Sequence, residues 1–564
     1  MLTTKYQQNL TDMPHNYYPR PQMKRDSFLC LNGWWDFNVT ENAQKQTFDS
    51  QILVPFPPES SASGINRIIG KAEYMHYRRK FTLPKEFIKD RVLLHFGAVD
   101  SRCEVYINEK LVGKNTGGYV PFFFDITEFL MDGENDLYVL ATDGIDKSLP
   151  YGKQTYKRGG MWYTPVSGIW QTVWMESVPE SYIRSLRITP TKESVTVSVE
   201  GGTGRKSLKL ENGEVYEFSG DSITVSPESP HPWTPEDPFL YRFELCCGED
   251  KVESYFALRE VGVKLINGKK RLTLNGEPYL FNGLLDQGYY PDGIFLPSTL
   301  DGIKDDILLT KKLGFNMLRK HIKIEPMIYY YLCDVEGVAV FQDMLNNSDY
   351  SFFRDTVLPT VGFQKLSDKR MHSDKNERAI FQEQMLKTAE HLYNCPCIVY
   401  YTIFNEGWGQ FNSDAMYKIL KEKDPTRIID STSGWFRQKL SDVDSRHVYF
   451  KALKIKGRTA EPLVISEFGG YSHRVDGHLF GEKNYGYRLF TDKTEFEKAF
   501  VKLYETEVIP LVLEGCDALV YTQLSDVEDE TNGLVTYDRD VVKINERLSK
   551  NTMDKVWQSH KKSI

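Results

Sequence analysis

Long apolar stretches are missing from this chain of 564 residues. It contains no run of roughly 18 apolar residues, so we expect neither a membrane-spanning helix nor a membrane partner. The N-terminal segment from Met1 to Arg20 also lacks the apolar core of a secretory signal peptide. We therefore expect a cytoplasmic protein.

An excess of positive charge and a cysteine-rich motif are missing too. The 70 basic and 78 acidic side chains give a net charge of −8, which argues against a nucleic-acid partner. The eight cysteines are scattered, and none of their spacings matches a zinc site. Cys395 and Cys397 are separated by a single proline. We expect free thiols there, with metal or redox use as the alternative.

The length and composition indicate a globular protein of two to four domains. Residues 1–178 hold many short alternating strands, separated by turn signals such as Asp132-Gly133, and show no helical periodicity. This pattern predicts a jelly-roll β-sandwich. Residues 179–262 contain a clean alternation from Val195 to Glu200 and have the size of an immunoglobulin-like β-sandwich, which we expect to be a spacer without chemistry.

From residue 263 onward, strands alternate with helices, which is typical of a parallel sheet. Eight strands can be counted, so residues 263–564 are predicted to form a (β/α)₈ TIM barrel. The expected strands are 279–285, 315–321, 338–343, 398–404, 427–431, 447–450, 464–467 and 518–522. Helices are expected at 300–313, 327–336 and 377–391. An insertion at 344–373 carries Tyr350, Phe352, Phe353 and Phe363, and its length suggests a lid or pocket wall.

Two of the expected barrel strands end in a glutamate. The apolar run from Ile398 to Phe404 resembles a strand buried on both faces, and Asn405 and Glu406 follow it. The segment around Glu467 repeats this arrangement. Barrel enzymes keep their chemistry at strand ends, and a pair of carboxyl groups is what glycoside hydrolysis needs. Taken alone, Glu406 has the alternative of capping the helix that follows it.

The segments Asn405-Glu406-Gly407-Trp408-Gly409-Gln410 and Ser466-Glu467-Phe468-Gly469 resemble the two catalytic motifs of glycoside hydrolase family 2. That family includes enzymes of the β-galactosidase, β-glucuronidase and β-mannosidase type. The resemblance runs from about Leu31 to about Leu534. It implies that Glu406 is the acid/base, that Glu467 is the nucleophile, and that Asn405 binds the 2-hydroxyl of the sugar.

The remaining strand ends are polar or aromatic, as a pocket for a hydroxyl-rich ring requires. Arg319 has two alternatives, to bind a carboxylate or sugar hydroxyl or to form a structural ion pair inside the barrel. Asp343 likewise has two, to bind a sugar hydroxyl or to orient Arg319. We expect His447 to begin its strand and to be structural. The expected substrate-binding residues are Asn405, Asp286, Gln287, Arg319, His321, Asp343, Trp408, Trp435 and Tyr449.

The sequence therefore predicts a retaining, exo-acting β-glycosidase, most similar to β-galactosidases, that uses two glutamates in a double displacement. Leu285-Asp286-Gln287-Gly288 departs from the Arg-Gly-x-Asn-x-His pattern of well-known β-galactosidases. His321-Ile322-Lys323 likewise departs from their His-Tyr-Pro. No convincingly placed Asn-x-Lys clamp, typical of glucuronidases, is found. Specificity for glucuronide, mannoside or arabinoside stays open.

Two further alternatives remain, a transglycosylase and a non-catalytic carbohydrate-binding protein on the same scaffold. Neither family metal ligands nor a cofactor motif can be assigned, so we expect catalysis without an obligatory metal or other cofactor. The expected partner is an oligosaccharide or glycoside substrate. Because relatives self-associate through sandwich domains, a homo-oligomer is also possible.

Overall fold

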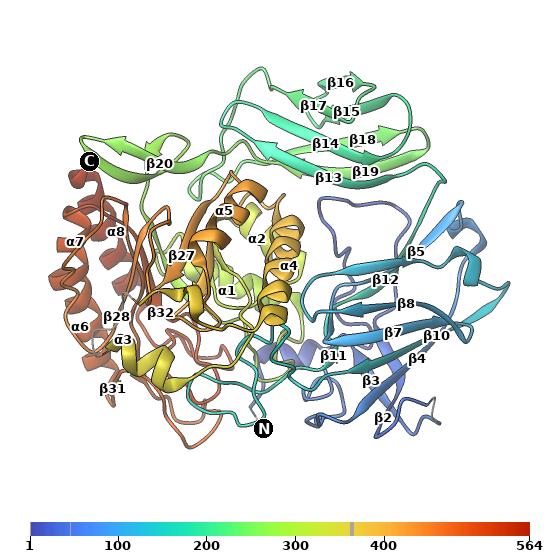
Figure 1. Ribbon diagram of the computed structural model, residues 1–564, viewed down its shortest axis with the longest axis horizontal. Coiled ribbons are helices and arrows are strands. Elements are labelled where there is room, and N and C mark those ends of the chain that lie inside the picture. The colour runs from blue at the N-terminus through green and yellow to red at the C-terminus, as the bar shows by residue number, and fades with distance from the viewer. Residues whose placement is uncertain (1, 45–46, 361–365) are drawn as a thin grey trace.

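The N-terminal part of the chain is a β-sandwich, drawn in blue at the right of Figure 1. The structure is a computed structural model that describes residues 2–44, 47–360 and 366–564. Two antiparallel sheets face one another, and alternate side chains such as Trp35, Tyr77 and Val105 fill the space between them without exposure to solvent. One sheet comprises β2 (Gly33–Thr40), β3 (Ser50–Val54), β4 (Tyr74–Thr82), β7 (Arg102–Ile107), β8 (Lys110–Thr116) and β10 (Glu134–Thr142). The other comprises β1 (Leu29–Cys30), β5 (Arg91–Phe96), β9 (Phe122–Asp125) and β12 (Val173–Val178), and β6 (Val99–Asp100) pairs with β11 (Gly168–Ile169).

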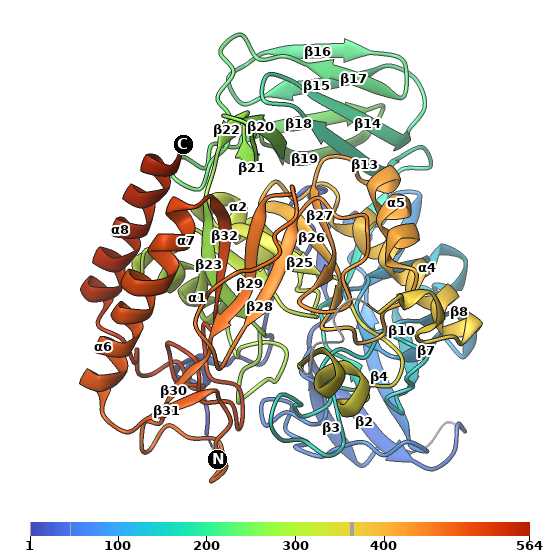
Figure 2. The same cartoon turned by 60° about the vertical axis from the view of Figure 1, so that its left-hand side comes forward.

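A smaller sandwich follows and lies at the top of Figure 2. Its alternating pattern buries Val195, Val197 and Val199 on one face of β14, as the sequence predicts. Three strands form one sheet: β13 (Ile183–Pro190), β14 (Val195–Gly201) and β17 (Ser222–Val225). Four form the other: β15 (Lys206–Leu210), β16 (Val215–Phe218), β18 (Tyr241–Cys247) and β19 (Asp250–Phe256).

A buried ion network joins the two sandwiches. Arg25 donates to Asp250 of the second sandwich over 2.8 Å and to Glu176 of the first over 3.2 Å. All three side chains are at most 2% exposed. Because an unpaired charge would be costly at such depth, the network fixes how the two domains meet.

The sequence analysis did not identify the small antiparallel sheet that precedes the barrel. It consists of β20 (Val261–Ile266), β21 (Lys269–Leu274) and β22 (Glu277–Pro278). Buried Leu272 belongs to the same apolar cluster as Phe281 of the first barrel strand. The sheet of β20, β21 and β22 therefore packs against β23, the first strand of the barrel. We retain the domain boundaries near residues 178 and 262 as proposals.

The eight predicted parallel strands are present, in the order β27-β26-β25-β24-β23-β32-β29-β28. The two end strands, β27 and β28, are neighbours without a ladder in the part of the chain described, so the barrel is nearly closed. Strand six differs most from the prediction, because it begins earlier and ends at Val448. The strands are β23 (Phe281–Asp286), β24 (Met317–Lys320), β25 (Ala339–Asp343), β26 (Ile398–Asn405), β27 (Ile428–Ser433), β28 (Asp444–Val448), β29 (Leu463–Gly469) and β32 (Cys516–Thr522).

The three predicted barrel helices are confirmed as α1, α2 and α4, and their ends have local causes. The Asp374 carboxylate accepts the backbone N–H groups of Asn376 and Glu377 at the start of α4. Gly337 ends α2 with φ of +72°, where a Cβ would lie 2.4 Å from the Pro235 carbonyl oxygen. The helices are α1 (Leu300–Lys312), α2 (Met327–Glu336), α3 (Leu358–Thr360), α4 (Lys375–Leu392), α5 (Ser413–Lys423), α6 (Lys493–Leu503), α7 (Ile509–Leu513) and α8 (Glu546–Ser563).

The helical ring is incomplete on one side. Residues 434–462 are all described and contain no helix, so none follows β27 or β28. Helices α6, α7 and α8 lie at the left of Figure 2, on the side of β32, and a short parallel pair, β30 (Tyr471–His473) and β31 (Arg488–Phe490), lies below them. No helix within the described ranges is both long and apolar enough to cross a membrane. All eight cysteines are free thiols. That Cys395 and Cys397 have no metal or redox use stays a prediction.

Candidate active site

Glu467 lies at the carboxyl end of β29, buried among hydrogen-bond donors. Arg319 Nη1 donates to its Oε1 over 3.0 Å, and the Tyr449 hydroxyl donates to its Oε2 over 2.7 Å. His447 Nδ1 lies 3.6 Å from the same Oε2. A carboxylate held by an arginine, a tyrosine and a histidine is favoured in its ionised form.

The pKa of Glu467 reflects these neighbours. Burial raises it, but the charges of His447, Arg319 and His321 and the hydrogen bond from Tyr449 lower it to about 2. Glu467 is therefore an anion at neutral pH, although it is only 5% exposed. An ionised carboxylate with an open face is what a nucleophile requires.

Glu406 occupies the residue just after β26, and the backbone turns sharply there. Its φ is +52°, and its N–H donates to the Ser433 carbonyl over 2.9 Å. The side chain is 22% exposed and its Oε1 lies 2.8 Å from His447 Nδ1. Gly434 permits this contact, since a Cβ there would lie 2.8 Å from the His447 ring. Glu406 is thus accessible to a substrate while one oxygen is engaged.

The expected position of His447 in its strand is wrong. His447 comes near the end of its strand, not at its beginning, and its ring lies between the two glutamates. Its Nε2 is 2.8 Å from the Ser433 hydroxyl, which itself donates to Ser466. A hydroxyl that has given its proton away can only accept, so His447 carries a proton on Nε2. The one signal in the sequence was a histidine on a predicted barrel strand, although the prediction of 447–450 made it the first residue of that strand.

The two carboxyl groups are close. One carboxylate oxygen each of Glu406 and Glu467, together with a His447 nitrogen, lie within 4.8 Å of one another. Retaining glycosidases hold their carboxyl groups about 5–5.5 Å apart, whereas inverting enzymes leave about 6.5–9.5 Å for a water. The separation is compatible with direct attack by one carboxylate on a sugar carbon.

Two clusters of described residues have the donor types that a cation could use. One is the pair of glutamates with His447, and the other is His478, Asp538 and Asp540. In the cluster of Glu406, His447 and Glu467, all three side chains already take part in hydrogen bonds to other protein groups. The expectation of catalysis without an obligatory metal stays a prediction.

Arg319 is the hub of a buried network at the ends of β24, β25 and β29. Its Nε donates to Asp343 over 3.0 Å, and its Nη2 donates to Asn405 Oδ1 over 2.8 Å. Asp343 also lies 2.7 Å from His321 Nδ1. Burial raises the pKa of Asp343, but Arg319 and His321 lower it to about 2. Arg319 therefore forms the structural ion pair with Asp343 and also orients Glu467. Direct contact of Arg319 with a sugar stays a prediction.

The network leaves two groups for a sugar to bind. Because Arg319 can only donate, Asn405 must turn Oδ1 toward it, which leaves the Asn405 amide N–H groups as donors. Burial and the nearby Lys153 lower the pKa of His321, although Asp343 acts in the opposite direction. When His321 loses its charge and donates from Nδ1 to Asp343, its Nε2 becomes an acceptor. Binding of sugar hydroxyls by both residues stays a prediction.

The predicted aromatic residues differ in their access. Tyr449 stacks on Tyr487 at 3.8 Å between ring centroids, while its hydroxyl binds Glu467. Trp435 is partly buried with its ring 5.9 Å from that of His447, a position suited to a stacking wall. Trp408 is only 3% exposed, so it supports the wall from behind. Contact of Tyr449, Trp435 and Trp408 with the substrate stays a prediction.

Asp286 and Gln287 were expected to read hydroxyl groups. Asp286 accepts from Lys320 over 2.6 Å, from Tyr329 over 3.2 Å and from the Gly288 N–H over 2.9 Å. These contacts favour a structural role for it beneath the pocket. Gln287 is 3% exposed and its Oε1 has no hydrogen-bond partner among the described residues, so hydroxyl binding by Gln287 stays a prediction.

A loop of the first sandwich enters the barrel mouth, and the sequence analysis did not assign it there. A Cβ on Gly152 would lie 3.1 Å from the Ile322 carbonyl, next to His321. Further along the loop, the Tyr163 hydroxyl donates to Glu530 in the loop after β32. Trp162 packs edge-on against Trp408 at 5.1 Å.

Lys153 is the charged residue of this loop. It is partly buried, and it forms no salt bridge with a described residue. Its charge nevertheless lowers the pKa values of both His321 and Glu530, so the ammonium group lies near both. Burial dominates the pKa of Glu530 and raises it, with Glu467 acting in the same direction. The mouth therefore holds a cation that has no fixed partner. The local sequence around Lys153 carries no signal for a role in the site, which only the position of Lys153 in the fold indicates.

The insertion packs on the sandwich loop through Tyr350. Tyr350 packs against Trp162 at 5.2 Å. Phe352 and Phe353 are 66% and 64% exposed and point away from any core. Phe363 lies outside the described residues. The pocket wall and the lid expected of this insertion both stay predictions.

Three sequence profiles of known families match the chain. They are the sugar binding domain of glycosyl hydrolases family 2 at residues 38–179, the profile named glycosyl hydrolases family 2 at 183–259, and the TIM barrel domain of that family at 265–556. The last alone covers just over half of the chain and includes both glutamates.

Curated relatives match over most of the chain. A beta-galactosidase of Pseudoalteromonas haloplanktis is 26% identical over 552 residues, covering 86% of this chain and 49% of that protein. A beta-galactosidase of Kluyveromyces lactis is 28% identical over 490 residues, covering 74% and 45%. The chain therefore spans about half the length of the curated relatives it matches.

Solved structures share the fold. A beta-glucuronidase of an uncultured Clostridium species superposes with a TM-score of 0.72 at 17% identity, covering 95% of this chain and 99% of that one. A beta-galacturonidase from Eisenbergiella tayi bound to galacturonate gives 0.69 at 19% identity, covering 96% and 99%. From the three matching profiles and this shared architecture, the chain belongs to glycoside hydrolase family 2.

Proposed function

We propose that the protein is a retaining β-glycosidase that removes terminal β-linked sugars. The observation that carries the proposal is the pair of carboxyl groups within 4.8 Å of each other, in two different environments. Glu467 is buried and held as an anion by Arg319 and Tyr449, whereas Glu406 is half-buried with one oxygen on His447. Splitting two carboxyl groups in this way assigns one as nucleophile and the other as proton donor.

In the first step, a Glu467 oxygen forms a bond to the anomeric carbon while the bond from that carbon to the leaving oxygen breaks. Glu406 gives its proton to the leaving oxygen. His447 keeps the Glu406 carboxyl oriented, and Arg319 keeps Glu467 aimed at the sugar. The step ends with a glycosyl ester on Glu467 and Glu406 as an anion.

In the second step, Glu406 takes a proton from a water that enters from the side of the departed group. The water oxygen bonds to the anomeric carbon, the ester bond to Glu467 breaks, and the sugar leaves with its original configuration. The hydrogen bonds from Arg319 and Tyr449 stabilise Glu467 as it regains its negative charge.

A β-galactoside is the first candidate substrate. The curated relatives that the chain matches at about a quarter identity are named beta-galactosidases. The sandwich loop with Trp162 and Tyr163 packs across the barrel mouth, which favours a terminal sugar over an internal one.

A β-linked uronide is the second candidate, and Lys153 favours it. An ammonium group without a salt bridge at the barrel mouth could pair with the carboxylate of a uronic acid. The structural neighbours named glucuronidase and galacturonidase are too distant in sequence to add to this argument.

The test combines a substrate panel with stereochemistry. Wild-type protein is incubated with aryl β-galactoside, glucoside, glucuronide, galacturonide, mannoside, arabinoside and fucoside, and ¹H NMR follows the first sugar anomer released. We expect one member to be cleaved with initial release of the β-anomer. A 2-deoxy-2-fluoro analogue of that member should attach to Glu467, as peptide mass spectrometry would detect.

Matched variants separate the two roles. Glu467→Gln should abolish turnover of every aryl glycoside, and Glu406→Ala should retain turnover only where the leaving group needs no proton, with azide yielding the β-glycosyl azide. Initial release of the α-anomer would refute the mechanism. Binding without turnover would indicate a carbohydrate-binding protein, and transfer of the sugar to an added acceptor in preference to water would indicate a transglycosylase.

A further inference from the structure

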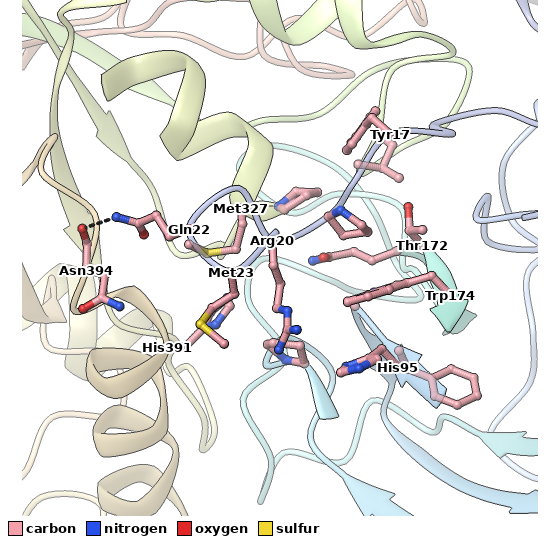
Figure 3. A pocket seen from close by; sticks show the side chains of 17 residues that line it. Tyr17, Arg20, Gln22, Met23, His95, Thr172, Trp174, Met327, His391 and Asn394 are labelled. Carbon is pink, nitrogen blue, oxygen red and sulfur yellow. Dashed lines mark hydrogen bonds between the residues drawn. The ribbon is translucent and has the colours of Figure 1, made fainter. Parts of the chain in front are cut away.

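A cavity of about 150 Å³ lies between the first sandwich and the barrel, remote from the two glutamates. The N-terminal segment that contains Tyr17 and Met23 runs along it, as Figure 3 shows. Trp174 of β12 lies on one side, and Met327 and His391 of helices α2 and α4 lie on the other. Three separate parts of the fold therefore meet around one space.

The size of the space limits what can occupy it. A cavity of about this volume in another protein takes a single benzene ring. A sugar with its hydroxyl groups would need many polar partners, which this wall of Trp174, Met23, Met327, Phe96 and prolines does not offer. Methionine side chains adapt to flat rings and make favourable sulfur–aromatic contacts. Size and lining together favour one aromatic ring.

The charges around the cavity are already neutralised. Arg20 donates to Glu176 over 2.6 Å, and Glu176 also accepts from Arg25. His95 stacks on Trp174 at 4.0 Å and is also hydrogen-bonded to Glu176. With the one arginine on the wall paired, the cavity favours a neutral occupant.

His391 supplies the polar handle. It is partly buried in the last turn of α4, lines the cavity and has no hydrogen-bond partner among the described residues. Burial lowers the pKa of His391 to about 4, so the imidazole is neutral at pH 7, with one donor nitrogen and one acceptor nitrogen.

Two further polar atoms on the wall lack hydrogen-bond partners within the part of the chain that the structure describes. Gln22 donates through Nε2 to the Asn394 carbonyl over 2.8 Å, the dashed contact in Figure 3, but its Oε1 is buried without a partner. Arg20 Nε is buried without a partner as well. A polar group of a ligand in the cavity could pair with either atom.

We propose that this cavity is a binding site for a small neutral phenol, whose ring packs between Trp174 and the two methionines and whose hydroxyl pairs with His391. Such a ligand would contact both domains at once. Because it would bind the folded protein only, it would raise the temperature of unfolding. The proposal does not depend on the glycosidase assignment.

The test uses phenol itself and methionines labelled with ¹³C in the methyl group. The chain has 14 methionines, and methyl signals remain sharp in a protein of this size. We expect the signals of Met23 and Met327 to shift saturably on titration with phenol, because both line the cavity. Anisole, which has no hydroxyl proton to give, should bind about fivefold more weakly.

Variants at Met327 provide the control. Met327→Leu preserves the volume and should bind phenol as the wild type does, whereas Met327→Trp fills the cavity and should lose binding. The remaining methionine signals report whether each variant is folded, and His391→Phe offers a second variant that removes only the handle.

Three outcomes would overturn the proposal. One is an unsaturable response, which would mean that the cavity holds only water. Another is a shift confined to Met344, which follows Asp343 and would place phenol in the barrel mouth. The third is equal binding by folded Met327→Trp and Met327→Leu.

Discussion

His447 Nδ1 lies 2.8 Å from Glu406 Oε1, and the same ring nitrogen lies 3.6 Å from Glu467 Oε2. One imidazole thus touches both carboxyl groups of the proposed reaction. His447 Nε2 is hydrogen-bonded to Ser433, so Nδ1 is the ring nitrogen that contacts Glu406. This contact can change when Glu406 gains or loses its proton. His447 is therefore a positioning residue for the acid/base.

Replacement of His447 by alanine should affect poor leaving groups most. We expect kcat/KM for a phenyl glycoside to fall by about 10²–10⁴, because proton donation contributes about that much. A dinitrophenyl glycoside, whose leaving group needs no proton, should lose far less. Steady-state kinetics on both substrates give the ratio. Ser433→Ala, which removes only the outer contact, is the milder control. Equal losses of kcat/KM on both substrates would show that His447 acts on the nucleophile Glu467 or stabilises the fold, and does not position the acid/base.

Tyr449→Phe should move the acid limb of the pH profile. Glu467 must be ionised to attack, so activity falls as the pH drops through its pKa of about 2. The Tyr449 hydroxyl helps to lower that pKa, and its loss should raise the pKa and shift the acid limb to higher pH. The measurement is kcat/KM for a dinitrophenyl glycoside from pH 2 to 7, so that the start of the wild-type acid limb is included.

Thr522→Val is the matched control for Tyr449→Phe. Thr522 Oγ1 lies 2.7 Å from the Tyr449 hydroxyl but belongs to no contact with Glu467. Its loss should leave the acid limb nearly in place. If Tyr449→Phe also leaves it in place, the phenol does not tune the nucleophile.

The strands of the barrel could be predicted because β26 and β29 carry an unbroken apolar signal. Each residue of β26 from Ile398 to Asn405 is buried, as a strand covered on both faces requires. The glutamates at their ends followed from position and residue type alone. Strand six was misplaced because Asp444 and Arg446 look like loop residues, whereas in the fold they pair with each other. This mistake concealed the role of His447.

The rest of the site depends on contacts between distant segments. Gly152 meets Ile322 and Tyr163 meets Glu530 across 170 and 367 positions of sequence. No local pattern in the first sandwich signals that its loop ends in the mouth of another domain. Asp286 shows another limit, since a polar strand end predicts a sugar-binding residue but does not reveal its contacts with Lys320 and Tyr329. Sugar binding by Asp286 stays a prediction.

Asp343→Asn should destabilise the barrel. Removing the charge leaves buried Arg319 with one carboxylate fewer, and breaking a buried pair costs about 3–5 kcal/mol. The wild-type pKa of Asp343 is lowered to about 2, below the unfolded value of about 3.9. Its contribution is therefore present above about pH 4 and is lost as the pH falls toward 2.

Thermal unfolding at pH 7 and pH 3 tests this prediction. The wild type should lose more stability between the two values than Asp343→Asn does. Glu134→Gln, which removes an exposed partner of Lys80, should leave both values nearly unchanged. A wild-type unfolding temperature that Asp343→Asn matches at pH 7 would show that the pair contributes little.

Lys153→Met separates the two candidate sugars. If the ammonium group pairs with a uronate, its removal should lower kcat/KM for the glucuronide or galacturonide by about 100-fold, as the loss of a charged partner does. The galactoside should change by less than about threefold. The thioether keeps most of the side-chain length, so packing of the loop against Ile322 is preserved.

Arg158→Met is the control, because Arg158 belongs to the same loop but lies 3.7 Å from Asp529 and so already has a partner. It should leave the ratio of uronide to galactoside turnover unchanged. A wild type that cleaves only the galactoside, with Lys153→Met impaired on it, would assign Lys153 to a neutral sugar. In that case the ammonium group acts as a hydrogen-bond donor to a hydroxyl and offsets the acidic charge of Glu530 and Glu467.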